Sequence, residues 1–74
     1  MDRSALDAGL LAAHENGDTA LLVRLYLKAA DGTEDAAASA FYLTHAYVFA
    51  LEAGLEEVAS IRARLVAQGA EPDP

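Results

Sequence analysis

The most constraining feature of this sequence is the segment 36–53, AAASAFYLTHAYVFALEA, which is apolar almost throughout. On a helix of 3.6 residues per turn its side chains form two stripes, one made of Leu43, Ala46, Ala50 and Ala53 and the other of Phe41, Thr44, Val48 and Glu52. Apolar groups therefore surround nearly the whole helix. We expect it to have neighbours on at least two flanks and to be the most buried helix of the fold.

Length and composition limit how the rest of the chain can be stabilised. A chain of 74 residues forms one domain and buries only about 60% of the surface that its unfolded form exposes. There is no cysteine, so disulfides, cysteine-based zinc sites and thiol nucleophiles are excluded. The core must come from helix packing, and the hydrophobic fraction of 54% is largely alanine. We expect leftover apolar surface and weak self-association.

The charge balance excludes several classes of partner. Twelve acidic and five basic residues give a net charge of -7, which repels nucleic acids and anionic membranes. The start of the chain, MDRSALDAGL, has no apolar signal segment, and we expect a cytoplasmic protein. The segment 36–53 is too short and too polar, at Ser39, Thr44 and His45, to predict a membrane span.

Glycine-containing breaks divide the chain into four predicted helices, at about residues 4–16, 19–30, 34–53 and 55–68. Ser4, with Asp7 three residues later, is the predicted start of the first helix, and Asp18 and Thr33 are the predicted caps of the second and third. Gly54 is predicted to end the third helix. Residues 1–69 make a single domain, and residues 70–74, AEPDP, are typical of a flexible acidic tail.

Helical periodicity also predicts the core. The expected core side chains are Leu6, Leu10, Leu11 and Ala13, then Leu21, Leu22, Leu25, Tyr26 and Ala29, and finally Leu55, Val58, Ile61, Leu65 and Val66. The outer two helices are one-sided, whereas the inner two are apolar nearly all round. Short breaks favour antiparallel neighbours. The predicted fold is therefore all-α, with four antiparallel helices arranged as two consecutive helix-turn-helix hairpins.

The two halves of the chain are similar to each other. An offset of 37 residues pairs Gly17 with Gly54, Gly32 with Gly69 and Leu6 with Leu43. These halves resemble the tetratricopeptide repeat, a helical hairpin of about 34 residues that stacks into protein-binding scaffolds. The features that match are the turn glycines, Leu22 with Tyr26, Ala59, and Pro72 near the end of the second half. Neither half has the family's early Trp or its Leu-Gly pair, and Ala63 replaces a large aromatic residue.

The resemblance implies a binding groove lined by the first helix of each hairpin. The matching positions are Ser4, Asp7, Leu11, His14 and Glu15 in the first half, and Phe41, Thr44, Val48, Leu51 and Glu52 in the second. Periodicity alone already puts Phe41, Val48 and Glu52 on one side of a helix. Such a mixed apolar and acidic stripe suits a partner segment with an apolar anchor flanked by Lys or Arg.

Candidate catalytic and metal-binding residues have simpler interpretations, so the chain is predicted to be a non-enzyme without cofactor or metal. Gly17 interrupts the helix between His14 and Asp18, which removes an i,i+4 metal pair. The acidic pairs 34–35 and 56–57 open helices, where the helix dipole favours acids. Ser4, Ser39 and Ser60 lack a nucleophile motif. His45 is predicted to be partly buried with a backbone or hydroxyl partner, and the aromatic residues 41, 42, 47 and 49 are predicted to be core.

The sequence leaves three functions open. The first is a protein-interaction module, an adaptor or small accessory subunit that docks on a larger protein through the groove. The second is an acidic inhibitor or antitoxin-like protein that occludes a basic site, which strong salt dependence would favour. The third is a symmetric dimer that covers its own apolar surface.

Overall fold

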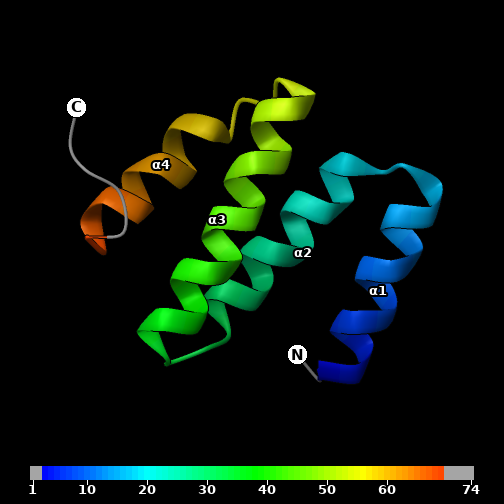
Figure 1. The fold of residues 1–74 in the computed structure, drawn as a ribbon, viewed down its shortest axis with the longest axis horizontal. Coiled ribbons are helices and arrows are strands. Elements are labelled where there is room, and N and C mark those ends of the chain that lie inside the picture. The colour runs from blue at the N-terminus through cyan, green and yellow to red at the C-terminus, as the bar shows by residue number, and fades with distance from the viewer. Residues whose placement is uncertain (1–2, 70–74) are drawn as a thin grey trace.

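The computed structural model describes residues 3–69 and is all-helical over that range. It has four helices, α1 (Arg3–Asn16), α2 (Thr19–Asp31), α3 (Ala36–Ala53) and α4 (Val58–Ala67), shown in Figure 1. The predicted all-α class and the existence of four helices are confirmed. The predicted acidic tail, residues 70–74, lies outside the described residues, as does Pro72.

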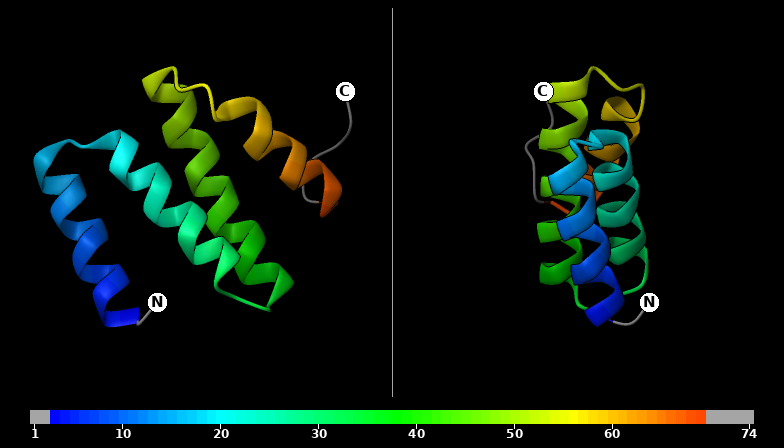
Figure 2. Two further views of the ribbon diagram at one scale, coloured as in Figure 1. Left: turned by 180° about the vertical axis from the view of Figure 1, so that it is seen from behind. Right: turned by 90° about the vertical axis from the view of Figure 1, so that its right-hand side faces the viewer.

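The helices follow one another in chain order across a thin slab whose Cα atoms span 34 × 28 × 12 Å (Figure 1). The packing between α2 and α3 is the most extensive, with α1 packed on α2 and α4 packed on α3. Seen edge-on, α1 and α3 lie toward one side of the slab and α2 and α4 toward the other (Figure 2, right). A slab of two such layers leaves the outward side of each layer uncovered.

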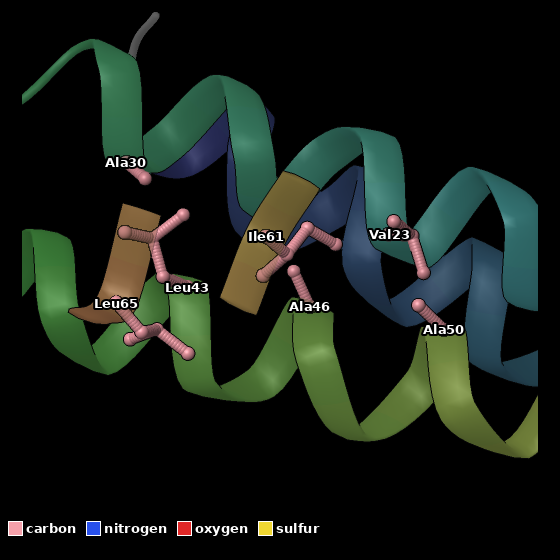
Figure 3. Packing of buried hydrophobic residues seen from close by; sticks show 7 residues of the cluster. All are labelled: Val23, Ala30, Leu43, Ala46, Ala50, Ile61 and Leu65. Atoms are coloured by element: carbon pink, nitrogen blue, oxygen red, sulfur yellow. The ribbon is translucent and has the colours of Figure 1, made fainter. Parts of the chain in front are cut away.

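The core is formed by α2, α3 and α4. It is a cluster of seven buried side chains that point toward one another in Figure 3, namely Val23, Ala30, Leu43, Ala46, Ala50, Ile61 and Leu65. The small side chains of α3 allow close helix packing, while Leu43, Ile61 and Leu65 fill most of the volume. The helix α1 adds a separate contact through the buried residues Leu6 and Ala13.

Several predicted core positions of α1 and α2 are wrong. Leu11 is 61% exposed and Leu21 is 38% exposed, whereas Val23, which was not predicted, is almost fully buried. The reason is the direction in which α2 faces its main neighbour. Val23 and Ala30, two turns apart, point into the core cluster with α3, which places Leu21 on the outward side.

The helix α3 is central, as predicted, but it is not enclosed. It has four buried residues, and α2 has the same number, so α3 is not distinctly the more buried of the two. On its outward side Phe41 is 56% exposed, Val48 45% and Leu51 52%. Ala53, predicted on the buried stripe, is also exposed. Neighbours on two flanks leave the side that faces away from the slab open to water.

The predicted turn glycines at the ends of α1 and α3 are confirmed. Gly17 and Gly54 both have φ 66°, the left-handed conformation that other residues adopt only at a cost. In each turn the amide after the glycine donates to a carbonyl five residues back: Asp18 to Ala13 at 2.9 Å and Leu55 to Ala50 at 3.0 Å. Both helices thus end in the same hydrogen-bonded motif.

Three predicted helix starts are corrected. Ser4 lies inside α1 rather than at its cap. The cap of α3 is Asp35, whose carboxylate accepts from the amides of Ala37 and Ala38, while Thr33 accepts from the Asp35 amide. The helix α4 begins at Val58 rather than Leu55, because the amide of Leu55 donates to the carbonyl of Ala50 in the turn that ends α3.

We expect Asp35→Ala to lower the free energy of unfolding by about 1 kcal/mol, because two amides of α3 lose their side-chain acceptor. Urea denaturation followed by circular dichroism measures the change. Glu34→Ala, an equally exposed acid one residue earlier, is the matched control. An equal loss in both variants would attribute the effect to charge near the helix dipole rather than to the cap.

Candidate functional site

The predicted groove residues lie on exposed sides of α1 and α3. We call this set the α1–α3 face; it comprises Asp7, Leu11, His14, Glu15, Phe41, Thr44, Val48, Leu51 and Glu52, all of them exposed. Among the described residues there are five exposed large apolar side chains, and four of them, Leu11, Phe41, Val48 and Leu51, belong to this face. Ser4, at the start of the same series, is exposed as well.

One ring contact links the two helices of the face. The His14 ring lies edge-on to the ring of Phe49, with the centroids 5.5 Å apart. The helix backbones of α1 and α3 do not pack on each other, so the two helices meet through side chains such as this ring pair. Asp7 lies two helical turns before His14, toward the other end of α1.

The α3 half of the face contains a shallow hollow. It has a volume of about 190 Å³ and is lined by Thr44, His45, Val48 and Phe49. Thr44 donates from its hydroxyl to the carbonyl of Ala40 at 2.8 Å. The Nδ1 atom of His45 lies 2.9 Å from the carbonyl oxygen of Phe41, which confirms the predicted backbone partner of this histidine. Because these polar groups bond within the helix, the hollow presents mainly apolar surface.

An aromatic cluster supports the face from beneath. The ring centroid of Tyr26, on α2, lies 5.2 Å from the ring centroid of His45, 5.9 Å from that of Phe49 and 6.4 Å from that of Tyr42. Burial raises the pKa of the Tyr26 hydroxyl above its ordinary value, and the neighbouring Tyr42 raises it further. Tyr42 and Phe49 are half-buried, in agreement with the predicted core role. Tyr26 was predicted to be a core residue and not a part of the face. Its contact with His45 and Phe49 joins two helices, so the spacing of residues within α2 could not predict it.

Phe41 departs from the predicted core role. It is more than half exposed, and its ring centroid lies 4.3 Å from that of His45 and 5.7 Å from that of Tyr42. The ring is therefore held on one side by two other rings while its other side faces water. An aromatic side chain supported in this way loses little rotamer freedom when a partner covers it.

Charge is distributed unevenly between the two sides of the slab. The α1–α3 face carries three acids, Asp7, Glu15 and Glu52, and no Lys or Arg. Among the residues whose side chains the structure describes, the basic ones lie on the other two helices: Arg24 and Lys28 on α2, and Arg62 and Arg64 on α4. Arg64 forms an ion pair with Asp31 of α2. The face thus combines four large apolar side chains with three acids, two of which, Glu15 and Glu52, lie in the last turns of their helices.

The other candidate groups have structural roles. Ser39 accepts a hydrogen bond from the Gln68 side chain at 3.2 Å, and Ser60 donates to the carbonyl of Glu57 at 3.0 Å. Within residues 3–69, no three His, Asp or Glu side chains gather in a way that could hold a metal ion. No helix over the same range is both long and apolar enough to cross a bilayer.

Comparison of the chain with protein-family models, with curated proteins and with solved structures gave no match. The resemblance to the tetratricopeptide repeat stays a prediction, and the α1–α3 face has to be interpreted from its own chemistry.

Proposed function

We propose that this protein is a protein-interaction module, an adaptor or small accessory subunit, whose α1–α3 face docks a basic amphipathic segment of a larger protein. The observation that carries this proposal is the concentration of exposed apolar side chains on one acidic face. Scattered exposed apolar residues are ordinary, but a patch with a polar margin marks an interaction site. The three acids of the same face favour a partner with Lys or Arg beside its apolar anchor.

The energetics are adequate for specific binding. Burying a fully exposed large apolar side chain contributes about 1.5–3 kcal/mol. Phe41, Val48 and Leu51 are each about half exposed, so covering all three contributes about 2–4 kcal/mol before the cost of association. These residues project from one helix that packs on both flanks, so the face needs little rearrangement to bind. Pre-organisation of this kind lowers the entropic cost of docking.

We also propose the finer architecture, two tetratricopeptide-like antiparallel hairpins, α1–α2 and α3–α4. The identical motif at Gly17 and Gly54, with the same φ angle, supports this division. In this scheme α2 and α3, whose contact is the largest in the structure, form the boundary between the two hairpins. The α1–α3 face is then the surface made by the first helix of each.

We expect Phe41→Ala to weaken docking of a basic amphipathic peptide by about 2 kcal/mol, roughly thirtyfold, because Phe41 is the largest exposed anchor of the face. The probe is a synthetic helical peptide of Leu and Lys with Leu on one side, and its Kd is measured by calorimetry. The peptide control replaces Lys with Glu.

The matched protein control is Leu21→Ala, which removes an exposed apolar side chain from α2 instead of α3. We expect this variant to bind the Leu and Lys peptide as the parent does. Equal binding of the basic and acidic peptides, or an unchanged Kd for Phe41→Ala, would show that the face is not the docking site.

A second candidate is an acidic inhibitor that covers a basic site on another protein. The net charge of -7 and the exposed acids of the face favour it. In that case charge rather than the apolar anchor determines affinity. Glu52→Lys would then weaken binding more than Phe41→Ala does, and high salt would abolish it.

A further inference from the structure

A second exposed patch lies on the outward side of α2. Leu21, Arg24, Leu25 and Lys28 recur at helical spacing along it, and we call these four residues the α2 patch. Leu21, Arg24 and Lys28 are exposed, and Leu25 is half-buried. A shallow hollow of about 430 Å³ runs along the same side, and its lining is mainly apolar surface from Leu21, Leu25 and Leu27. Asp31 also lines the hollow, and its carboxylate is paired with Arg64 of α4. The patch thus combines apolar side chains with two basic ones.

The α2 patch and the α1–α3 face are complementary. One combines Leu21 and Leu25 with two basic residues, and the other combines four large apolar residues with three acids. The helices that carry them lie in opposite layers of the slab (Figure 2, right). Two different complementary surfaces on opposite sides of one molecule can pair between copies without hindering each other.

We propose that, in the absence of another partner, the α1–α3 face is occupied by the α2 patch of a second copy of this chain. Because the two surfaces differ, the contact is heterologous, or head-to-tail, and each added copy leaves one free surface of each kind. This differs from the symmetric dimer predicted from composition, in which a surface meets itself. In a symmetric pairing of the α1–α3 face, Asp7, Glu15 and Glu52 would find no basic residue of that face to pair with.

The net charge does not prevent this contact. At physiological ionic strength the Debye length is about 8 Å, so acids far from the contact are largely screened. Charges within the contact act over shorter distances, and there Arg24 and Lys28 meet acids. We therefore expect a weak association whose specificity comes from the local charge pairing.

The test uses two complementary double variants in sedimentation velocity at physiological salt. L21E/R24E replaces one apolar and one basic residue of the α2 patch, and it leaves the helix start intact because Asp18 still caps α2. E15K/E52K reverses two acids of the α1–α3 face, each in the last turn of its helix, where Lys suits the helix dipole. Circular dichroism checks that both remain helical.

We expect each variant alone to associate at least about tenfold more weakly than the parent, which itself associates. An equimolar mixture should recover association, because the intact α1–α3 face of L21E/R24E meets the intact α2 patch of E15K/E52K. The control E34K/E57K has the same net charge as E15K/E52K but changes exposed acids outside both surfaces, and it should associate at least as well as the parent.

Other outcomes overturn the inference. A parent that stays monomeric at millimolar concentration excludes the contact. Association of either variant at parental strength excludes the head-to-tail pairing. A mixture that does not recover association also excludes it, and a symmetric dimer is then the remaining arrangement. Failure here is distinguishable from failure of the proposed function, because L21E/R24E keeps its α1–α3 face and can be titrated separately with the Leu and Lys peptide.

Discussion

Leu43→Asp is expected to abolish the folded state at 25 °C. Leu43 is fully buried at the centre of the cluster formed by α2, α3 and α4. An unpaired carboxylate in that position loses its hydration without gaining a partner, which costs several kcal/mol in addition to the packing that is lost. A chain of 74 residues has a total stability of about 4–11 kcal/mol, so this one substitution removes most or all of it.

The measurement is far-ultraviolet circular dichroism with thermal melting. Val48→Asp places the same side chain on the exposed side of the same helix and should leave the melting curve nearly unchanged. Leu43→Ala gives an intermediate case, with an expected loss of about 2–5 kcal/mol. A cooperative transition of Leu43→Asp at the parental temperature would refute the assignment of Leu43 to the core.

Deletion of the outer helices is expected to have unequal effects. Removal of residues 58–74 takes Ile61 and Leu65, both essentially inaccessible to water, out of the core cluster. Each contributes about 1.5–3 kcal/mol by burial, so their joint loss approaches the stability of the whole domain. We expect that chain to be largely unfolded.

Removal of residues 1–17 should be tolerated better. It takes away Leu6 and Ala13 but none of the seven residues of the cluster, and it preserves Asp18, whose carboxylate accepts from the Leu21 amide at the start of α2. We expect a cooperative transition at a lower temperature than that of the full chain. Melting curves of the two truncated chains, measured side by side, check the order. If the chain without α1 unfolds and the chain without α4 does not, α1 rather than α4 completes the core.

The sequence predicted the helices well because their signals are local. The end of α3, the turns at Gly17 and Gly54 and the cap at Asp18 all follow from residues within a few positions of one another. The late start of α4 was not predicted. Leu55 belongs to the preceding turn, where its amide donates a hydrogen bond to the carbonyl of Ala50, and the composition of the segment does not reveal this bond.

Burial was harder to predict because it depends on which side of a helix meets its neighbour. Periodicity separated Leu43, Ala46 and Ala50 from Phe41 and Val48 correctly. In α2 almost every position is apolar, so periodicity could not choose between Leu21 and Val23 as the inward residue. The position of the candidate face followed from α3, where the two sides differ in side-chain size, whereas the ring contact between α1 and α3 required the tertiary structure.

The chain-order packing of the four helices has a consequence for folding kinetics. Over residues 3–69, each helix packs on the helix directly before or after it in the chain. Contacts of this kind close short loops, so the entropy lost before the first stabilising contact forms is small. Helical proteins with such local topology fold in microseconds to milliseconds. The pair α2 and α3, with the largest contact and a four-residue connection, is the natural nucleus, to which α4 and then α1 can be added in sequence.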